Sequence, residues 1–232
     1  MSDIRIGSYN IHGCVGLDKK HAPSRIAAVI RDMRAPIVGL QEVDTHSIEE
    51  SSLDQLEYLA KNTRMNAVAG PTLARRVGHY GNALLTRFPV RAVRRLDLSV
   101  PGREPRGAID ADVELPSGGL LRVFVTHFGL KGFERREQLR GLLPLVREEP
   151  ERPCVVLGDF NEWSRKGEVI RALDEALEPT DPVPSFPSWW PILSLDRIWV
   201  RPRSAFRSSS AFLSLGSRIA SDHLPVVATL DL

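Results

Sequence analysis

The sequence of 232 residues contains only two cysteines, Cys14 and Cys154, which lie far apart and form no CxxC pattern. A disulfide framework or a zinc site is therefore not expected. No apolar run approaches the ~20 residues that a membrane-spanning helix needs. The N-terminal residues lead directly into a strand-like alternation and include no apolar segment of the kind found in signal peptides. We therefore expect a cytoplasmic protein without a transmembrane segment.

The sequence also has little net charge. Its formal value of +2 does not require a nucleic-acid partner. Arginine dominates the basic residues, and its planar fork suits bidentate contact with phosphate. The hydrophobic fraction of 42% is sufficient for a core, and the length fits one α/β domain. Without a repeat or a linker, the chain is predicted to form a single domain over residues 1–232, and no obligate protein partner is evident.

Apolar periodicity predicts both strands and helices along the chain. Strands are expected at residues 4–8, 37–40, 82–86, 109–115, 121–125, 155–157, 195–200, 211–215 and 224–230. The strand at 109–115 should have one solvent-exposed face, which carries Asp110. Helices are expected at 26–33, 133–146 and 169–177, and after a capping box made by Ser52 and Gln55. Several strand-to-strand connections without helices favour largely antiparallel sheets in an α/β (α+β) fold.

Polar side chains follow many of these apolar runs at the point where each run ends. Each residue alone has a simple explanation, for example a turn for Asn10 and Asn82. Glu42 could be a solvated charge and His127 a histidine with satisfied hydrogen bonds. Strand ends can nevertheless converge on one rim and build a site there. Eight residues fit that pattern: Asn10, Glu42, Asn82, His127, Asp159, Asn161, Asp222 and His223.

The oxygen donors in this set indicate a metal-dependent hydrolase. Carboxylate and amide oxygens suit Mg²⁺ or Mn²⁺ better than zinc. Such a cation polarises a phosphoryl oxygen and stabilises a leaving group. His127 and His223 would add groups that bind a phosphate oxygen or move a proton. The combination favours hydrolysis of a phosphate ester.

Seven short motifs occur along the chain in the order SYNIHG, QEVD, GNALLTRFP, THF, GDFN, LDRI and SDHLP. This ordered set resembles the endonuclease/exonuclease/phosphatase superfamily from about residue 4 to residue 230, and the compact chain is most similar to its small bacterial-type hydrolases. The resemblance implies a four-layer αββα sandwich, in which two mixed, mostly antiparallel sheets pack face to face with helices outside. The predicted rim of strand ends would then be the mouth of a cleft between the sheets.

The resemblance also implies roles at matching positions around a metal ion. Glu42 is similar to the family's principal metal ligand, with Asn10 beside it, and Asp222 to a second position near the metal. Asp159 matches the residue that orients or deprotonates the attacking water. Asn161 would hold that water or a phosphate oxygen.

The remaining positions would contact the phosphate or move protons. His223 would bind the phosphate or transfer a proton, and Asp196 of LDRI would orient its ring. His127 resembles a histidine that stabilises the transition state, and Asn82 an amide that positions the phosphate. Arg106 stands before a predicted strand and could direct its guanidinium at the substrate phosphate.

The substrate stays open at this point. A phosphodiesterase acting on a lipid headgroup or a small molecule is the main expectation, and a DNA or RNA nuclease is the alternative. A family member that only binds phosphorylated ligands is the third possibility. Trp189 and Trp190 could stack on a base, lie in a lipid interface or pack against Phe186.

Overall fold

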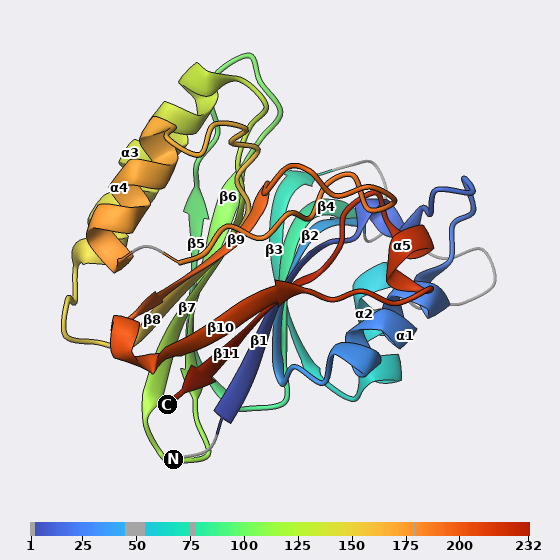
Figure 1. Cartoon of the computed structure of the whole chain (residues 1–232), viewed down its shortest axis with the longest axis horizontal. Coiled ribbons are helices and arrows are strands. Elements are labelled where there is room, and N and C mark those ends of the chain that lie inside the picture. The colour runs from blue at the N-terminus through green and yellow to red at the C-terminus, as the bar shows by residue number, and fades with distance from the viewer. Residues whose placement is uncertain (1–2, 45–53, 75–77, 179) are drawn as a thin grey trace.

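The computed structural model describes residues 3–44, 54–74, 78–178 and 180–232, and its strands form two sheets (Figure 1). The first sheet has the order β10-β11-β1-β2-β4-β3 and the second the order β5-β6-β7-β8-β9. β1 pairs with β2 and β7 with β8 in parallel, and the other neighbours are antiparallel. The bounds are β1 Asp3–Asn10, β2 Ile37–Asp44, β3 Asn66–Ala74, β4 His79–Thr86, β5 Val90–Asp97, β6 Gly107–Glu114, β7 Leu120–His127, β8 Cys154–Asp159, β9 Asp196–Arg201, β10 Phe206–Ala211 and β11 Val226–Asp231.

Helices cover the outer face of each sheet, which confirms the predicted αββα sandwich. α1 (Pro23–Met33) and α2 (Gln55–Thr63) pack on the six-stranded sheet, and α3 (Gly132–Arg147) and α4 (Glu168–Leu177) pack on the five-stranded sheet (Figure 1). The short elements are η1 (His12–Cys14), η2 (Arg203–Ala205) and α5 (Ser217–Ala220). No helix among the described residues has the length and apolar character needed to cross a bilayer.

The sandwich has three apolar cores, because both faces of each sheet are covered. Side chains of a strand alternate between its two faces. In β8, Val155 and Leu157 therefore enter the core between the sheets, whereas Val156 enters the core beneath α3 and α4. At the middle of the sandwich Gly39 allows close approach, since a Cβ there would lie 2.1 Å from Leu157 Cδ1. The alternation decides which polar residues face the space between the sheets.

Three strands differ from the prediction, and all three are edge strands. β3 and β5 were not predicted, and the strand expected at 211–215 is wrong because β10 runs from Phe206 to Ala211. Phe212 instead donates its N–H to Pro225 O, and the chain then turns into α5. An edge strand has one hydrogen-bonded neighbour and often carries polar side chains or proline, so its apolar pattern is weak.

Two smaller expectations are also corrected. The capping box of α2 is formed by Asp54 and Glu57, while Ser52 lies outside the described residues. The prediction that one face of β6 is exposed to solvent is wrong at Asp110, because this residue is buried. Arg122 Nε and Nη2 each donate to this carboxylate at 2.9 Å, so a buried ion pair replaces solvent there.

Candidate active site

Strand register brings three predicted site residues into one row. The parallel pairing of β7 and β8 places His127 beside Asp159, and the antiparallel pairing of β8 and β9 places Asp159 beside Asp196. All three continue the series of side chains that face the opposite sheet, as Val125, Leu157 and Ile198 do deeper in the core. A polar row therefore lies where the apolar core between the sheets ends.

Gly158 makes this register possible. Its φ is 155°, and a Cβ at this position would lie 1.9 Å from Thr126 O. Such an approach is too close for any side chain, so only glycine lets β8 lie this near to β7. The glycine of the GDFN motif thus positions Asp159 beside His127.

Asn10 connects the two sheets across the site. It ends β1 on the face between the sheets, and its Nδ2 donates to Glu42 Oε1 at 2.9 Å and to Asp159 Oδ2 at 3.0 Å. Its Oδ1 accepts the His12 N–H at 3.0 Å, which determines the orientation of the amide. The carboxylates of Glu42 and Asp159 therefore face the same small volume.

Glu42 reaches this volume because β2 contains a bulge. Leu40 pairs with Ala83 and Val43 with Gly81, so Gln41 and Glu42 together oppose Asn82 of β4. Glu42 has a φ of 57°, an uncommon value for a residue with a side chain. Bulges change the direction of side chains and occur often beside active sites. Without the bulge, the alternation would place Glu42 on the helix-covered face with Leu40.

The side chain of Asp159 is held by Asn161, two residues further along the chain. The Asn161 N–H donates to Asp159 Oδ1 at 2.9 Å, and Asn161 has a left-handed φ of 49°. Asn161 Nδ2 donates to Phe128 O at 2.9 Å and lies 3.1 Å from His127 Nε2. Because the amide supplies a hydrogen to each partner, His127 Nε2 is the acceptor and its imidazole is neutral.

His223 forms a buried pair with Asp196. Its Nδ1 lies 2.7 Å from Asp196 Oδ2, and the Ser185 hydroxyl donates to the same oxygen at 2.6 Å. The Phe186 ring packs on the imidazole, with ring centroids 4.8 Å apart. His223 Nε2 lies 3.7 Å from Asp159 Oδ2, so the ring joins the pair to the carboxylate row.

The two histidines have opposite pKa shifts. Burial alone would lower the pKa of His223, but the nearby carboxylates of Asp196 and Asp159 outweigh it and raise the pKa to about 10. For His127, burial dominates over the attraction of Asp159, and Arg106 adds repulsion, so the pKa falls to about 3. At neutral pH the site therefore contains one charged and one neutral imidazole.

The other predicted residues lie around this centre. Asn82 Nδ2 donates to Gly107 O at 2.9 Å, and Arg106 is buried with Nη1 2.6 Å from Glu104 Oε1. Asp222 is half-buried, and its Oδ1 lies 3.9 Å from His12 Nδ1. Seven buried side-chain atoms have no hydrogen-bond partner among the described residues, and three of them belong to predicted site residues: Asn82 Oδ1, Arg106 Nε and Asp196 Oδ1. Such atoms are costly unless a ligand satisfies them.

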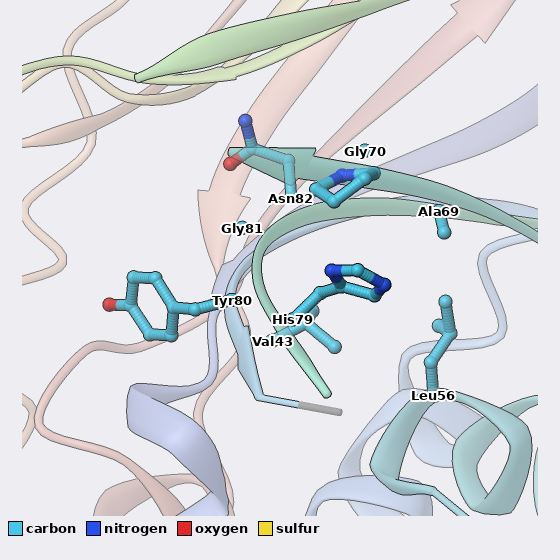
Figure 2. A pocket seen from close by; sticks show the side chains of 9 residues that line it. Val43, Leu56, Ala69, Gly70, His79, Tyr80, Gly81 and Asn82 are labelled. Atoms are coloured by element: carbon cyan, nitrogen blue, oxygen red, sulfur yellow. The ribbon is translucent and has the colours of Figure 1, made fainter. Parts of the chain in front are cut away.

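Sequence reasoning missed Tyr80, whose hydroxyl hydrogen-bonds to Glu42. Burial and the charge of Glu42 raise its pKa well above the usual value, so the phenol stays protonated. Figure 2 shows Tyr80 and His79 on opposite sides of β4, with His79 directed into a small pocket beside Leu56. The alternation Tyr80, Asn82, Leu84 was the available signal, but the strand was predicted to begin only at residue 82.

The donor set fits a hard divalent cation. One ligand atom from each of Asp159, Asp196 and His223 lies within 4.8 Å of the others. Glu42 and Asp159 offer a second pair of carboxylates, already brought together by Asn10. Oxygen donors of this kind suit Mg²⁺ or Mn²⁺.

Known proteins resemble this chain in sequence and in fold. A sequence model of the Endonuclease/Exonuclease/phosphatase family matches residues 7–223. The uncharacterized protein YbhP of Escherichia coli (strain K12) is 32% identical over 245 residues, which cover 98% of this chain and 96% of that protein.

Solved structures have the same fold. An endonuclease/exonuclease/phosphatase from Beutenbergia cavernae has a TM-score of 0.81 and 26% identity, covering 99% of this chain and 72% of that one. The mannosyl-6-phosphatase Bt3783 of Bacteroides thetaiotaomicron has a TM-score of 0.76 and 17% identity, covering 99% of this chain and all of that one. The latter likeness concerns the fold alone.

Proposed function

Because the chain belongs to the endonuclease/exonuclease/phosphatase family, we propose that it is a divalent-metal-dependent phosphodiesterase that hydrolyses its substrate by in-line attack of water on phosphorus. The observation that carries this proposal is the junction at Asn10, where the Glu42 and Asp159 carboxylates share one amide donor. A buried charged imidazole lies beside them at His223. Carboxylates, a fixed amide and a cationic donor are the groups that phosphoryl transfer to water requires.

Glu42 would hold the cation, Mg²⁺ or Mn²⁺, with Asn10 and Asp222 nearby. When bound, the cation would polarise a phosphoryl oxygen and offset the charge that develops there. The Tyr80 hydroxyl contacts Glu42 and would keep this carboxylate oriented. Glu42 is half-buried, which leaves it accessible from the mouth of the site.

Asp159 would orient the attacking water and accept its proton. The Asn161 N–H and the Asn10 amide fix both carboxylate oxygens, so the side chain has little rotational freedom. A positioned base of this kind contributes about 10²–10⁴ in rate. Asn161 would also help to hold the water or a phosphate oxygen.

The charged ring of His223 would donate a hydrogen bond to the phosphate or a proton to the leaving oxygen, with Asp196 orienting it. Neutral His127 would contribute to the transition state by holding Asn161, whose amide donates to its Nε2, without adding a second positive charge 3.5 Å from Asp159 Oδ2. Asn82 and Arg106 each have a buried atom without a partner, so both could position the phosphate.

A diester of a lipid headgroup or a small molecule is favoured over nucleic acid. The net charge of +2 provides no strong field for a polyanion. Binding without catalysis is disfavoured because every matched position carries a group capable of the expected role.

A hydrolysis screen tests the proposal. The protein should cleave bis-p-nitrophenyl phosphate with Mg²⁺ or Mn²⁺ and should cleave the monoester p-nitrophenyl phosphate more slowly. Asp159→Asn and His223→Ala should each reduce the rate by about 100-fold or more. Asp32→Asn, an exposed substitution on α1, is the matched control. Cleavage of the monoester alone, turnover of DNA or RNA alone, or full activity in both site variants would contradict the proposal.

A further inference from the structure

Exposed apolar side chains gather at one end of the sandwich. Among the described residues, eleven large hydrophobic residues are exposed: Leu17, Leu120, Leu130, Phe133, Trp163, Trp189, Trp190, Ile192, Leu213, Leu215 and Ile219. All of these except Leu120 lie in segments that follow β1, β7, β8 and β10 or precede β9 and β11. Register places those strand ends at the site, while Asp3 pairs with Asp231 at the opposite end, where Figure 1 shows both termini. We call the ten residues the apolar face.

One part of the apolar face lies beside the segment that carries His223. Trp189 and Trp190 are 62% and 66% exposed, so most of the surface of each side chain faces solvent. The preceding residue, Ser188, donates its N–H to Asp222 O at 2.7 Å and its hydroxyl to Ser221 O at 2.7 Å. The tryptophans are therefore fixed next to the site by backbone contacts.

Neighbouring segments extend this part of the face. The Leu17 N–H donates to Ile219 O at 2.9 Å, and Arg218 Nη1 donates to Trp189 O at 3.2 Å. The three segments that carry Leu17, Ile219 and Trp189 thus form one surface. Its position is held by hydrogen bonds and does not depend on burial of the exposed side chains.

A second part of the face lies on the side of the other sheet. Leu130 and Phe133 follow β7, and Trp163 comes two residues after Asn161. Arg135 joins these segments, since Nη1 donates to Leu130 O at 2.8 Å and Nε contacts Glu162 at 3.3 Å. Exposed apolar side chains therefore lie on both sides of the site.

The charges between these side chains are mainly basic. Exposed cations at this end are Lys19, Lys20, Lys131, Arg165, Lys166 and Arg218. Of the nearby acids, Asp18, Glu162 and Glu168 are ion-paired with arginines, and half-buried Asp222 lies in the site itself. Tryptophan, aliphatic residues and free cations together are typical of a protein surface that enters the headgroup layer of an anionic membrane.

We propose that the apolar face is a docking surface for an anionic phospholipid bilayer. A second copy of the chain is disfavoured because two such faces would bring like charges together. Nucleic acid would stack on aromatic rings, whereas six of the ten residues of the face are leucine or isoleucine, which provide no stacking surface. Docking in this orientation directs the mouth of the site toward headgroup phosphate esters. That the lipid is also the substrate rests on the proposed function, whereas binding of the protein to the bilayer does not.

Vesicle sedimentation with the full chain tests the proposal. The protein should bind vesicles of phosphatidylcholine with phosphatidylserine, and more weakly vesicles of phosphatidylcholine alone or at raised salt. Trp189→Ser and Trp190→Ser should each weaken binding about tenfold. Lys19→Ala and Lys20→Ala should each weaken it about fivefold. Leu120→Ser, an exposed apolar substitution at the opposite end, should leave binding unchanged.

Tryptophan fluorescence gives a second readout. Vesicles should shift the emission of the wild type to shorter wavelength and should shift the Trp189→Ser/Trp190→Ser variant less, since Trp199 is already buried. Equal binding by the tryptophan variants, absence of vesicle binding, a dimer formed through this face, or binding of single-stranded oligonucleotide alone would overturn the proposal.

Binding and catalysis are separable in this experiment. Asp159→Asn should bind vesicles as the wild type does. Vesicle binding without hydrolysis of any phosphodiester would support the docking surface and contradict the proposed function. Hydrolysis of bis-p-nitrophenyl phosphate without vesicle binding would overturn the docking surface alone.

Discussion

His223 Nδ1 lies 2.7 Å from Asp196 Oδ2, and both side chains are buried. The contact joins the segment before β11 in one sheet to β9 in the other. A carboxylate at Nδ1 fixes the orientation of the imidazole and favours its charged form. The pair thus determines the charge that His223 presents to Asp159.

The pH dependence of activity should change when this pair is broken. His223 has its pKa raised to about 10, so an activity that needs the charged ring should fall as pH rises through about 10. Asp196→Asn removes the carboxylate that raises the pKa most and should move this fall to lower pH, with a loss of about 100-fold near neutrality. A pH–rate profile together with imidazole NMR measures both effects. An unchanged profile would contradict the assigned role of Asp196.

The same shift has a consequence for stability. The pKa of His223 in the folded state lies above the ordinary value of about 6.5. The charged ring therefore stabilises the fold fully below about pH 6.5, and this contribution is lost as pH rises through about 10. In urea unfolding, the wild type should lose more stability over this range than His223→Gln does. Equal losses would show that the ring does not carry this contribution.

Metal binding should depend on Glu42. Addition of Mg²⁺ or Mn²⁺ should raise the Tm of the wild type, because a ligand that binds only the folded state stabilises it. Chelation should reverse the increase and abolish hydrolysis. Glu42→Gln keeps the size of the side chain but removes the charge, and it should eliminate the metal-dependent rise in Tm. Asp32→Asn should respond like the wild type, and a full response in Glu42→Gln would exclude it as the principal ligand.

The buried ion pair of the five-stranded sheet gives a stability prediction. Arg122→Ala leaves the buried Asp110 carboxylate without its two hydrogen bonds from Arg122. Removal of one partner from a buried pair typically costs about 3–5 kcal/mol. Arg94 Nη2 still lies 2.6 Å from Asp110 Oδ2 in this variant and should offset part of the cost. Replacement of both Arg122 and Asp110 by leucine should cost less, because no buried carboxylate is left and Arg94 keeps its contact with Glu148. Urea unfolding of the single and double variants compares the two costs, and a double variant as unstable as Arg122→Ala would contradict this account.

Gly158 should not tolerate a side chain. A Cβ would lie 1.9 Å from Thr126 O, which is backbone and can move only with β7. Gly158→Ala should therefore destabilise the protein by about 1–3 kcal/mol or more and also lower activity, since Asp159 follows directly. Gly119→Ala is the matched control, because its Cβ would meet only Ser117 Oγ at 3.8 Å. Equal unfolding midpoints for the two variants would refute the steric argument.

Strands within the sheets and the buried edge strand β9 could be predicted from the sequence, whereas the other three edge strands could not. Residues of β7 and β8 lie under helices on one face and under the opposite sheet on the other, so their apolar runs are unmistakable. β3, β5 and β10 each have a neighbour on one side only. An edge strand tolerates polar side chains, such as the serines of β10 and the arginines of β5. These residues interrupt the apolar alternation by which a strand is predicted from the sequence.

The sequence by itself determined the apolar periodicity, the order of the motifs and the polar residues at strand ends. These features depend on neighbours along the chain, so they are visible without coordinates. Only the tertiary structure decided which side chains meet, because register and bulges depend on partners far away in sequence. The bulge at Gln41 and Glu42 turns Glu42 away from the face it would otherwise occupy, and Asn10 then joins it to Asp159. Local alternation alone would have placed Glu42 beneath the helices.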